Sequence, residues 1–243
     1  MVSFAVMFLT ACKKDGQKDP EAVVFAANGD INTELNEFRN KLGTLNTTPG
    51  ATSGRREINW DAIADAQTGI QLPGDFFNAT GAGAPVTRQR GLIYAGTHEA
   101  MVSKNSFENI NANASSEFSS FSGDKSFAVV DAPEWPVEFR VAGQITPAVV
   151  NGMGIVFCDV DKPSSTFLEF FNDGISLGKF FVPAHDAGSK FSFLGVYFPN
   201  QKITSVKVGH EGKLADGEKD ISNGGTKDLV IMDDFIYSEP VAK

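Results

Sequence analysis

The spacing of apolar residues predicts one helix near the start of the chain. Ile31, Leu35, Phe38 and Leu42 follow one another at intervals of four, three and four residues, which places all four on one helical face. Gly43 comes next, and glycine is a frequent helix stop. We therefore predict a short amphipathic helix that begins at Ile31, ends at Gly43 and packs on the domain that follows.

Beyond residue 44 the pattern changes to short runs of Phe, Val and Ile between Gly, Asn, Asp and Pro. The chain of 243 residues contains 21 Phe, and aromatic and β-branched residues favour half-buried strands. This pattern predicts an all-β fold, an antiparallel β-sandwich of jelly-roll type over residues 44–243. Residues 64–90 are rich in Gly and Pro, so we expect mostly loop there. The predicted strands are 57–63, 91–95, 126–131, 136–142, 147–159, 166–171, 176–183, 190–198, 202–209 and 228–237.

The segment Asn172-Asp173-Gly174 predicts a tight hairpin. It lies between two apolar runs, residues 166–171 and 175–182. Glycine after aspartate supplies the positive φ that a two-residue hairpin turn requires. We expect the two runs to pair as antiparallel neighbours.

The first residues of the chain predict export and a lipid anchor. An apolar run of eleven residues ends in Leu9-Thr10-Ala11-Cys12, and it is too short to span a membrane. It resembles a bacterial lipobox, in which the small residue before the cysteine admits a signal peptidase and the thiol receives a diacylglycerol. The resemblance implies lipidation at Cys12, a signal peptide over residues 1–11 and a tether over residues 12–30. The alternative interpretation is a buried N-terminal strand or a chance match to the motif.

Charge and cysteine content agree with an exported protein. We expect an outer-membrane lipoprotein of the cell envelope that faces the periplasm or the cell surface. The formal net charge is −9, and no cluster of basic residues is longer than two, so we expect no nucleic-acid partner. If Cys12 is lipidated, Cys158 has no partner for a disulfide, and its apolar neighbours predict a buried, unreactive thiol.

Several aspartates lie within or beside apolar runs and predict a calcium site. Asp159 and Asp161 are two residues apart, which places them on one face of a strand. Calcium takes six to eight oxygen ligands and would neutralise their charge. The alternative is that the acids stand at strand ends, solvated or paired with Arg55, Arg56 or Arg140. The candidate ligands are Asp61, Asp159, Asp161, Asp233 and Asp234.

Two tryptophans are candidates for a platform that stacks against sugar rings. Trp60 alternates with Asn59 and Asp61, so we expect its side chain in the core. Trp135 lies between Glu134 and Pro136, where we expect a turn, and it is the predicted ligand-binding residue. The alternative for Trp135 is packing in the core or at its edge.

The sequence carries no motif of a known catalytic centre. It has neither a Gly-x-Ser-x-Gly elbow nor a His-Glu-x-x-His or paired Cys-x-x-Cys pattern. A glycosidase needs only two carboxylates, and the chain has 30 acidic residues. Among these acids Glu169 has its position most restricted by its neighbours, because it lies between Leu168 and Phe170 in a predicted strand. If those two apolar side chains point inward, Glu169 points to solvent.

Several motifs together resemble a family of exported bacterial proteins that has no assigned activity. The most specific are Gly54-Arg-Arg-Glu-Ile-Asn-Trp-Asp61 and Met232-Asp-Asp-Phe-Ile-Tyr237, and the resemblance covers roughly residues 31–240. It implies one exported β domain and supplies no catalytic residues. A weaker resemblance is to jelly-roll carbohydrate-binding and adhesion modules, whose last strand often ends in an Asp-Asp-aromatic pattern beside a structural calcium. The usual first-strand motif of those modules is missing here.

These observations leave two classes of function. The favoured one is a lipid-anchored binding or adhesion module for a glycan or a partner protein. The alternative is a lipoprotein glycoside hydrolase or another hydrolase that uses carboxylates. Exposed aromatic residues in a groove would favour binding, whereas two carboxylates facing each other about 5–10 Å apart in a cleft would favour hydrolysis.

Overall fold

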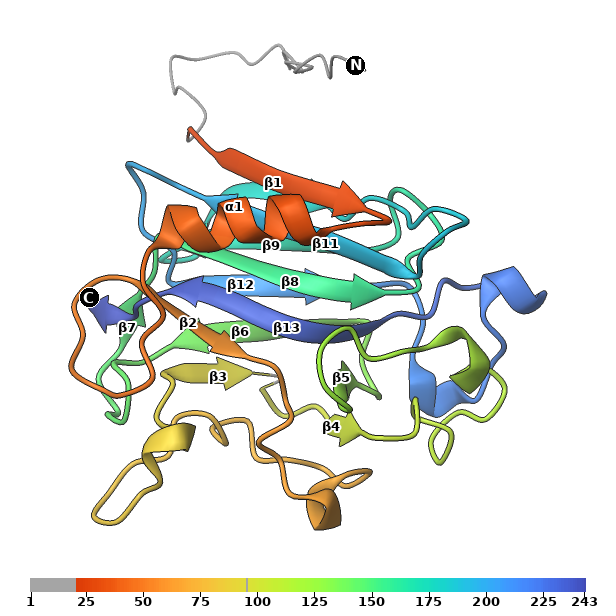
Figure 1. Ribbon diagram of the computed structural model, residues 1–243, viewed down its shortest axis with the longest axis horizontal. Coiled ribbons are helices and arrows are strands. Elements are labelled where there is room, and N and C mark those ends of the chain that lie inside the picture. Colours follow the sequence, from red (N-terminus) through yellow and green to blue (C-terminus); the bar gives the residue numbers. More distant parts are fainter. Residues whose placement is uncertain (1–20, 95) are drawn as a thin grey trace.

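The protein is an antiparallel β-sandwich with one α-helix (Figure 1). A computed structural model describes residues 21–94 and 96–243. Two large sheets face each other, and a small two-stranded sheet joins β7 (Ala148–Val149) to β14 (Val241–Ala242). The predicted all-β sandwich and the single N-terminal helix are therefore confirmed. None of the helices in these two ranges is long and apolar enough to cross a membrane.

The larger sheet has seven strands in the order β1-β11-β8-β13-β5-β4, and β2 pairs with the second half of β13. In β13 the register with β8 slips by one residue between Met232 and Phe235, which marks a β-bulge at Asp233 and Asp234. The strands are β1 (Val23–Asn28), β2 (Arg55–Ile58), β4 (Ala100–Ser103), β5 (Ser126–Val129), β8 (Gly152–Cys158), β11 (Phe191–Tyr197) and β13 (Ile231–Ser238).

The smaller sheet has five strands in the order β10-β9-β12-β6-β3. Asp173 and Gly174 join β9 to β10 with φ values of 51° and 81°, the pair of positive angles of a type I′ turn. The predicted hairpin is thus confirmed. The strands are β3 (Leu92–Tyr94), β6 (Glu134–Phe139), β9 (Phe167–Asn172), β10 (Ile175–Phe181) and β12 (Ser205–Gly209).

An aromatic cluster fills the space between the two large sheets. Trp60 is fully buried, as predicted, and its ring stacks on Phe127 with 4.0 Å between ring centroids. Phe235 meets the same indole edge-on at 5.0 Å, and the indole N–H donates to the backbone carbonyl of Asp233 over 2.8 Å. Edge-to-face and offset aromatic pairs add to the stabilisation from burial alone. This cluster therefore holds the two sheets face to face.

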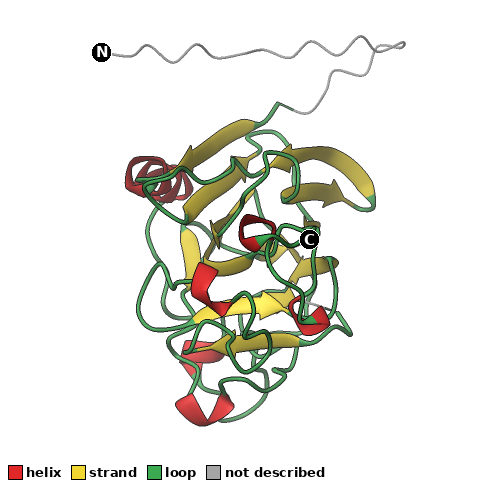
Figure 2. Ribbon diagram, turned by 90° about the vertical axis from the view of Figure 1, so that its right-hand side faces the viewer, coloured by secondary structure: helices red, strands yellow, loops and turns green. Residues whose placement is uncertain are grey.

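The predicted helix forms and covers part of the outer face of the seven-stranded sheet. It is α1 (Asn32–Leu42), and in Figure 1 it lies in front of the sheet, between β1 and β8. A Cβ atom on Gly154 or Gly195 would come within 2.9 Å of the Phe38 ring, so these two glycines let the helix approach closely. Figure 2 shows α1 nearly end-on at the periphery of the strands. Its buried residues Ile31, Leu35, Phe38 and Leu42 pack on Val156, Phe193 and Ile236.

Two long loop segments cover the rest of that outer face. Phe107 and Phe118 come from the segment between β4 and β5, and Leu214 and Leu229 come from the segment between β12 and β13. They enclose Cys158, which is buried as predicted, and burial raises the pKa of this thiol to about 12. The seven-stranded sheet is therefore covered on both faces. The five-stranded sheet instead turns charged and aromatic side chains to solvent on its outer face.

The structure corrects three boundaries. Residues 23–28, predicted as the end of a tether over 12–30, form edge strand β1, which pairs with β11 over its whole length. Strand β4 lies in a stretch with no predicted element. The predicted strand over 57–63 ends at Ile58, because Trp60 has a φ of 67° and the chain turns there. All three corrections reflect contacts with segments that are distant in the sequence, and local periodicity does not predict such contacts.

Acid should destabilise the protein through His210. Burial lowers the pKa of this imidazole to about 4, although its contact with the Gly212 carbonyl opposes the shift. In the unfolded chain the pKa is about 6.5, so the unfolded state takes up a proton first as the pH falls from about 6.5 to 4. The contribution of His210 to the free energy of unfolding is therefore greatest above about pH 6.5 and falls by roughly 3 kcal/mol by pH 4. Asp159 and Asp233, whose pKa values are raised to about 8, contribute in the opposite direction, so the His210 contribution is measured as a difference between variants.

Urea unfolding of His210→Asn at pH 7 and pH 4 tests this prediction. The asparagine amide can still donate to Gly212, so at pH 4 the variant should be more stable, relative to the unmutated protein, than it is at pH 7. His98→Asn is the matched control, because the His98 side chain is 39 % exposed, and its free energy of unfolding should follow the pH dependence of the unmutated protein. If His210→Asn also keeps the pH dependence of the unmutated protein, the assignment is wrong.

Candidate functional site

The outer face of the five-stranded sheet carries a groove of about 390 Å³. Strand alternation explains its composition, because in β6 Glu134 and Pro136 point to solvent while Trp135 and Val137 point to the core. The Phe171 ring at the end of β9 is half-buried. The lining residues that face solvent are Glu134, Pro136, Phe171, Ser205 and Lys207.

Lys207 lies at the centre of the charged groups in this groove. Its Nζ atom is 3.4 Å from Glu134 Oε2 and 3.8 Å from Glu169 Oε2, and 5.9 Å from the centroid of the Phe171 ring. Glu169 is therefore on the solvent face, as predicted. Solvent-exposed ion pairs of this kind contribute little to folding stability, so these groups remain available to a ligand. The groove offers hydrogen-bond donors and acceptors beside an apolar ring.

A second aromatic area lies on the same sheet face. Phe181 is 47 % exposed and meets Phe167 edge-on, with 6.1 Å between ring centroids. The Lys179 ammonium lies 3.8 Å from the centroid of Phe167. Phe167 and Phe171 are four residues apart on β9, hence separated by roughly 13 Å. An extended ligand could thus span both areas.

Trp135, the predicted ligand-binding residue, is in the core instead. It lies at the floor of the groove but is only 1 % exposed, and its ring runs parallel to Phe235 at 6.3 Å. It belongs to strand β6 and not to a turn. The alternation of Glu134, Trp135 and Pro136 along β6 was the signal that places the indole inward. Phe171, Pro136 and Lys207 are the groove residues that the sequence analysis did not identify.

Three of the five predicted metal ligands, Asp61, Asp233 and Asp234, hold the loop before β5. Asp233 Oδ2 accepts hydrogen bonds from the backbone N–H groups of Phe121 and Ser122, and Asp61 Oδ1 accepts one from the N–H of Asp124. The bulge in β13 aims Asp233 at this loop. Burial, and then repulsion from Asp234, raises the pKa of Asp233 to about 8.

Asp234 has a cationic partner that the sequence did not indicate. Its Oδ2 atom accepts a hydrogen bond from Arg39 of α1 at 3.1 Å, and its Oδ1 atom accepts one from the Ser122 hydroxyl. Arg39 also pairs with Glu57 at 2.9 Å. Protein groups therefore supply the partners for this carboxylate, although the arginine is Arg39 and not one of the three that the alternative named.

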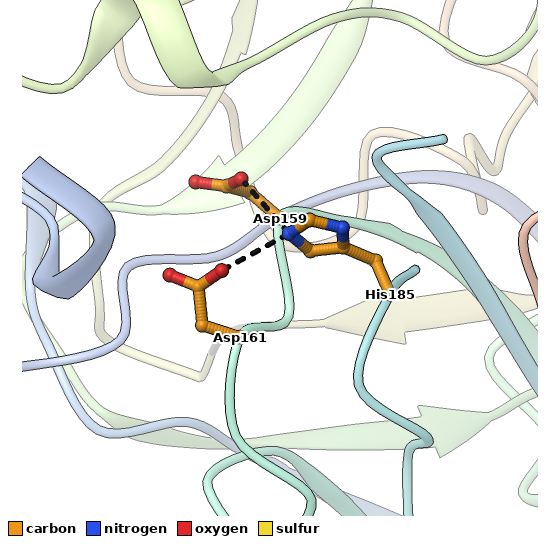
Figure 3. Close-up of side chains that lie close together, drawn as sticks. All are labelled: Asp159, Asp161 and His185. Atoms are coloured by element: carbon orange, nitrogen blue, oxygen red, sulfur yellow. Dashed lines mark hydrogen bonds and ion pairs between the residues drawn. The ribbon is translucent and has the colours of Figure 1, made fainter. Parts of the chain in front are cut away.

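The other two predicted ligands, Asp159 and Asp161, meet at a histidine just beyond the end of β8. His185 Nε2 lies 3.0 Å from Asp161 Oδ1 and 3.8 Å from Asp159 Oδ1 (Figure 3). The strand ends at Cys158, and Asp159 has a φ of 71°, so a turn and not strand alternation brings the carboxylates together. Burial, and then repulsion from Asp220 and Asp161, raises the pKa of Asp159 to about 8.

Comparisons with known proteins give little guidance to function. No protein-family model matches the chain, and no curated protein matches it in sequence. Among solved structures it is similar to one described as "Xylan-Binding Domain from CBM 22, formally x6b domain", at 11 % sequence identity over 72 % of this chain and 87 % of the other, with a TM-score of 0.19. A TM-score this low supports no inference about the ligand. The resemblance to an exported bacterial family stays a prediction.

The correction at Trp135 has a direct test. Trp135→Ala should lower the free energy of unfolding by about 3–5 kcal/mol, because it removes a buried indole and leaves a cavity. Trp135→Phe keeps an aromatic ring and should cost less than the alanine change. Denaturant titration measures both variants, and a loss under about 1 kcal/mol for Trp135→Ala would show that the indole is not part of the core.

Proposed function

We propose that this protein is a glycan-binding module held at the cell envelope by a lipid anchor, and that the groove on the five-stranded sheet receives the sugar. The observation that supports this most is the half-buried Phe171 ring in a groove that also contains the charged side chains of Lys207 and Glu134. The flat ring suits the apolar face of a pyranose. Lys207, Glu134 and Ser205 supply donors and acceptors for its hydroxyl groups.

The charge of the groove also suits a neutral polyol. Lys207 lies between two glutamates, Glu134 and Glu169, so cationic and anionic groups alternate over a short distance. A strongly charged ligand would meet a group of its own sign wherever it bound. Hydroxyl groups can donate to the carboxylates and accept from the ammonium, so they match both kinds of partner.

The same three residues bear on the alternative of a glycoside hydrolase. A retaining enzyme needs two carboxylates about 5–5.5 Å apart with the sugar between them. In the groove an ammonium is within 4 Å of both Glu134 and Glu169, in the place that a reacting sugar would need. This arrangement favours binding over hydrolysis. Release of reducing sugar from a bound oligosaccharide would reverse that preference.

Phe171→Ala tests the groove. The probes are xylan, cellulose and chitin oligosaccharides and peptidoglycan fragments, screened by affinity electrophoresis and then measured by calorimetry. The unmutated protein should bind at least one of them, and the variant should bind it about tenfold or more weakly, which corresponds to about 1.4 kcal/mol. The cause is loss of the ring on which the sugar stacks.

Phe181→Ala is the matched control for this measurement. Phe181 is an exposed phenylalanine on the same sheet, but it does not line the groove. Its replacement should weaken binding of a short oligosaccharide less than threefold, a difference of about 0.6 kcal/mol. If no probe binds, or if both variants weaken binding equally, the groove is not the glycan site.

The anchor is a separate part of the proposal. Cys12 lies outside the described residues, and the proposal rests on the motif Leu9-Thr10-Ala11-Cys12. In cells fed an alkyne fatty acid, the unmutated protein should become labelled, whereas Cys12→Ala should remain an unlabelled precursor. Cys158→Ala is the control and should label normally. Equal labelling of the Cys12 variant and the unmutated protein would rule out this anchor.

A further inference from the structure

A second site, just beyond the end of β8, consists of aspartates in two loops. Asp159 and Asp161 follow β8, while Asp220 and Asp228 lie in the segment that leads to β13. One carboxylate oxygen from each of Asp161, Asp220 and Asp228 lies within 4.8 Å of the other two. Asp220 and Asp228 are fully buried, and Asp159 is 2 % exposed. The sequence analysis did not identify Asp220 or Asp228.

The hydrogen bonds of Asp228 leave one oxygen unused. Its Oδ2 atom accepts from the backbone N–H groups of Asp161 and Lys162, both at 3.0 Å, and from the Ser165 hydroxyl. Its Oδ1 atom is buried and has no partner among the described residues. A buried polar atom without a partner is costly, on the order of 1–3 kcal/mol and more for a charged group. Three donors thus fix the carboxylate while its second oxygen stays free.

Asp161 and Asp159 each turn one carboxylate oxygen toward His185. The imidazole Nδ1 is 2.7 Å from the Asp186 carbonyl, and Nε2 faces Asp161 Oδ1. In the part of the chain that the structure describes, Oδ2 of Asp161 and Oδ2 of Asp159 are both buried and unpartnered. In Figure 3 the second oxygens of these two aspartates point to the same side, away from the imidazole. Three carboxylates in one cluster therefore each present an unused oxygen.

The positive charges near the cluster are already engaged elsewhere. Lys162 pairs with Glu211, and Lys190 lies 3.8 Å from Glu117 Oε2. Neither lysine forms an ion pair with the cluster. Among the described residues, His185 is the only basic side chain that does, and it can carry a single positive charge. Four buried or half-buried carboxylates thus exceed the local positive charge, which a divalent cation would offset.

We propose that Asp161, Asp220 and Asp228 bind one calcium ion, with Asp159 as a further ligand and His185 positioning Asp161. Calcium–oxygen distances are about 2.4 Å, so two oxygens on one ion lie at most about 4.8 Å apart, as they do here. An all-carboxylate set suits a hard cation. The hydrogen bonds to Asp228 and Asp161 orient these ligands, as outer partners do in metal sites.

Such an ion would join two parts of the chain that cover the same sheet face. One is the turn after β8, and the other is the segment from Asp220 to Asp228. That segment is flanked by Leu214 and Leu229, which pack over Ile231 on the outer face of the seven-stranded sheet. The cation would stabilise the native state and would not contact the glycan groove. The two proposals can therefore fail independently.

The test uses the whole chain, stripped with a chelator and then titrated with calcium. Calorimetry should give one calcium per chain. Calcium at about a hundred times its Kd should raise the melting temperature by about 5–10 °C. If calorimetry shows no calcium binding and chelator and calcium give the same melting temperature, the proposal is wrong. Tighter binding of zinc than of calcium would also overturn the choice of ion.

Asp228→Asn locates the site. Its side-chain carbonyl can still accept from Asp161 and Lys162, so the fold should persist, while the free oxygen and the charge are removed. The calcium-dependent shift should disappear, and the melting temperature in chelator should not fall. Asp233→Asn is the matched control, because it changes an equally buried aspartate of the other group, and it should keep the full shift. The reverse result, loss in Asp233→Asn alone, would place the ion elsewhere.

Discussion

The packing of aromatic rings between the two sheets is the constraint on which the rest of the structure depends. Trp60, Phe127 and Phe235 contact one another, and Tyr94 and Trp135 of the smaller sheet pack against them. This cluster commits one face of each sheet to the core. The remaining two faces then differ. Helix α1 and two loop segments cover the outer face of the larger sheet, so only the smaller sheet can present a broad regular surface to a ligand. The groove beside Phe171 follows from this division of the faces.

The second constraint is that a buried carboxylate needs hydrogen-bond donors or a cation. The two groups of buried aspartates differ in how this need is met. Asp233 and Asp234 receive donors from a loop and from Arg39, so that group is complete within the protein. The aspartates near His185 are not complete, because each of three carboxylates keeps a buried oxygen without a described partner. The first group stabilises a loop against a bulged strand. The second has the chemistry of a cation site, and the difference lies in the available donors and not in the number of acids.

A β-sandwich does not by itself specify a function, because the same fold carries many unrelated sites. Here the arguments for function come from particular side chains. A phenylalanine on an exposed sheet face, beside a lysine shared by two glutamates, supports the binding of hydroxyl-rich ligands. A cation held by the loop aspartates would act on stability. A binding surface on rigid strands and a stabilising ion in the loops are compatible in one domain.

The sequence by itself determined the local elements of this protein. The spacing from Ile31 to Leu42 is enough for α1, and Asp173-Gly174 is enough for the β9–β10 turn, because periodicity and turn chemistry act between neighbours. The alternation along β6 already indicates that Trp135 points to the core. Tertiary structure alone brought Asp220 and Asp228 to Asp161, and Lys207 to Glu134 and Glu169. These outcomes depend on strand pairing and on contacts across some sixty residues of chain. No local pattern records such contacts, so the residues of the sites became visible only once the sheets were assembled.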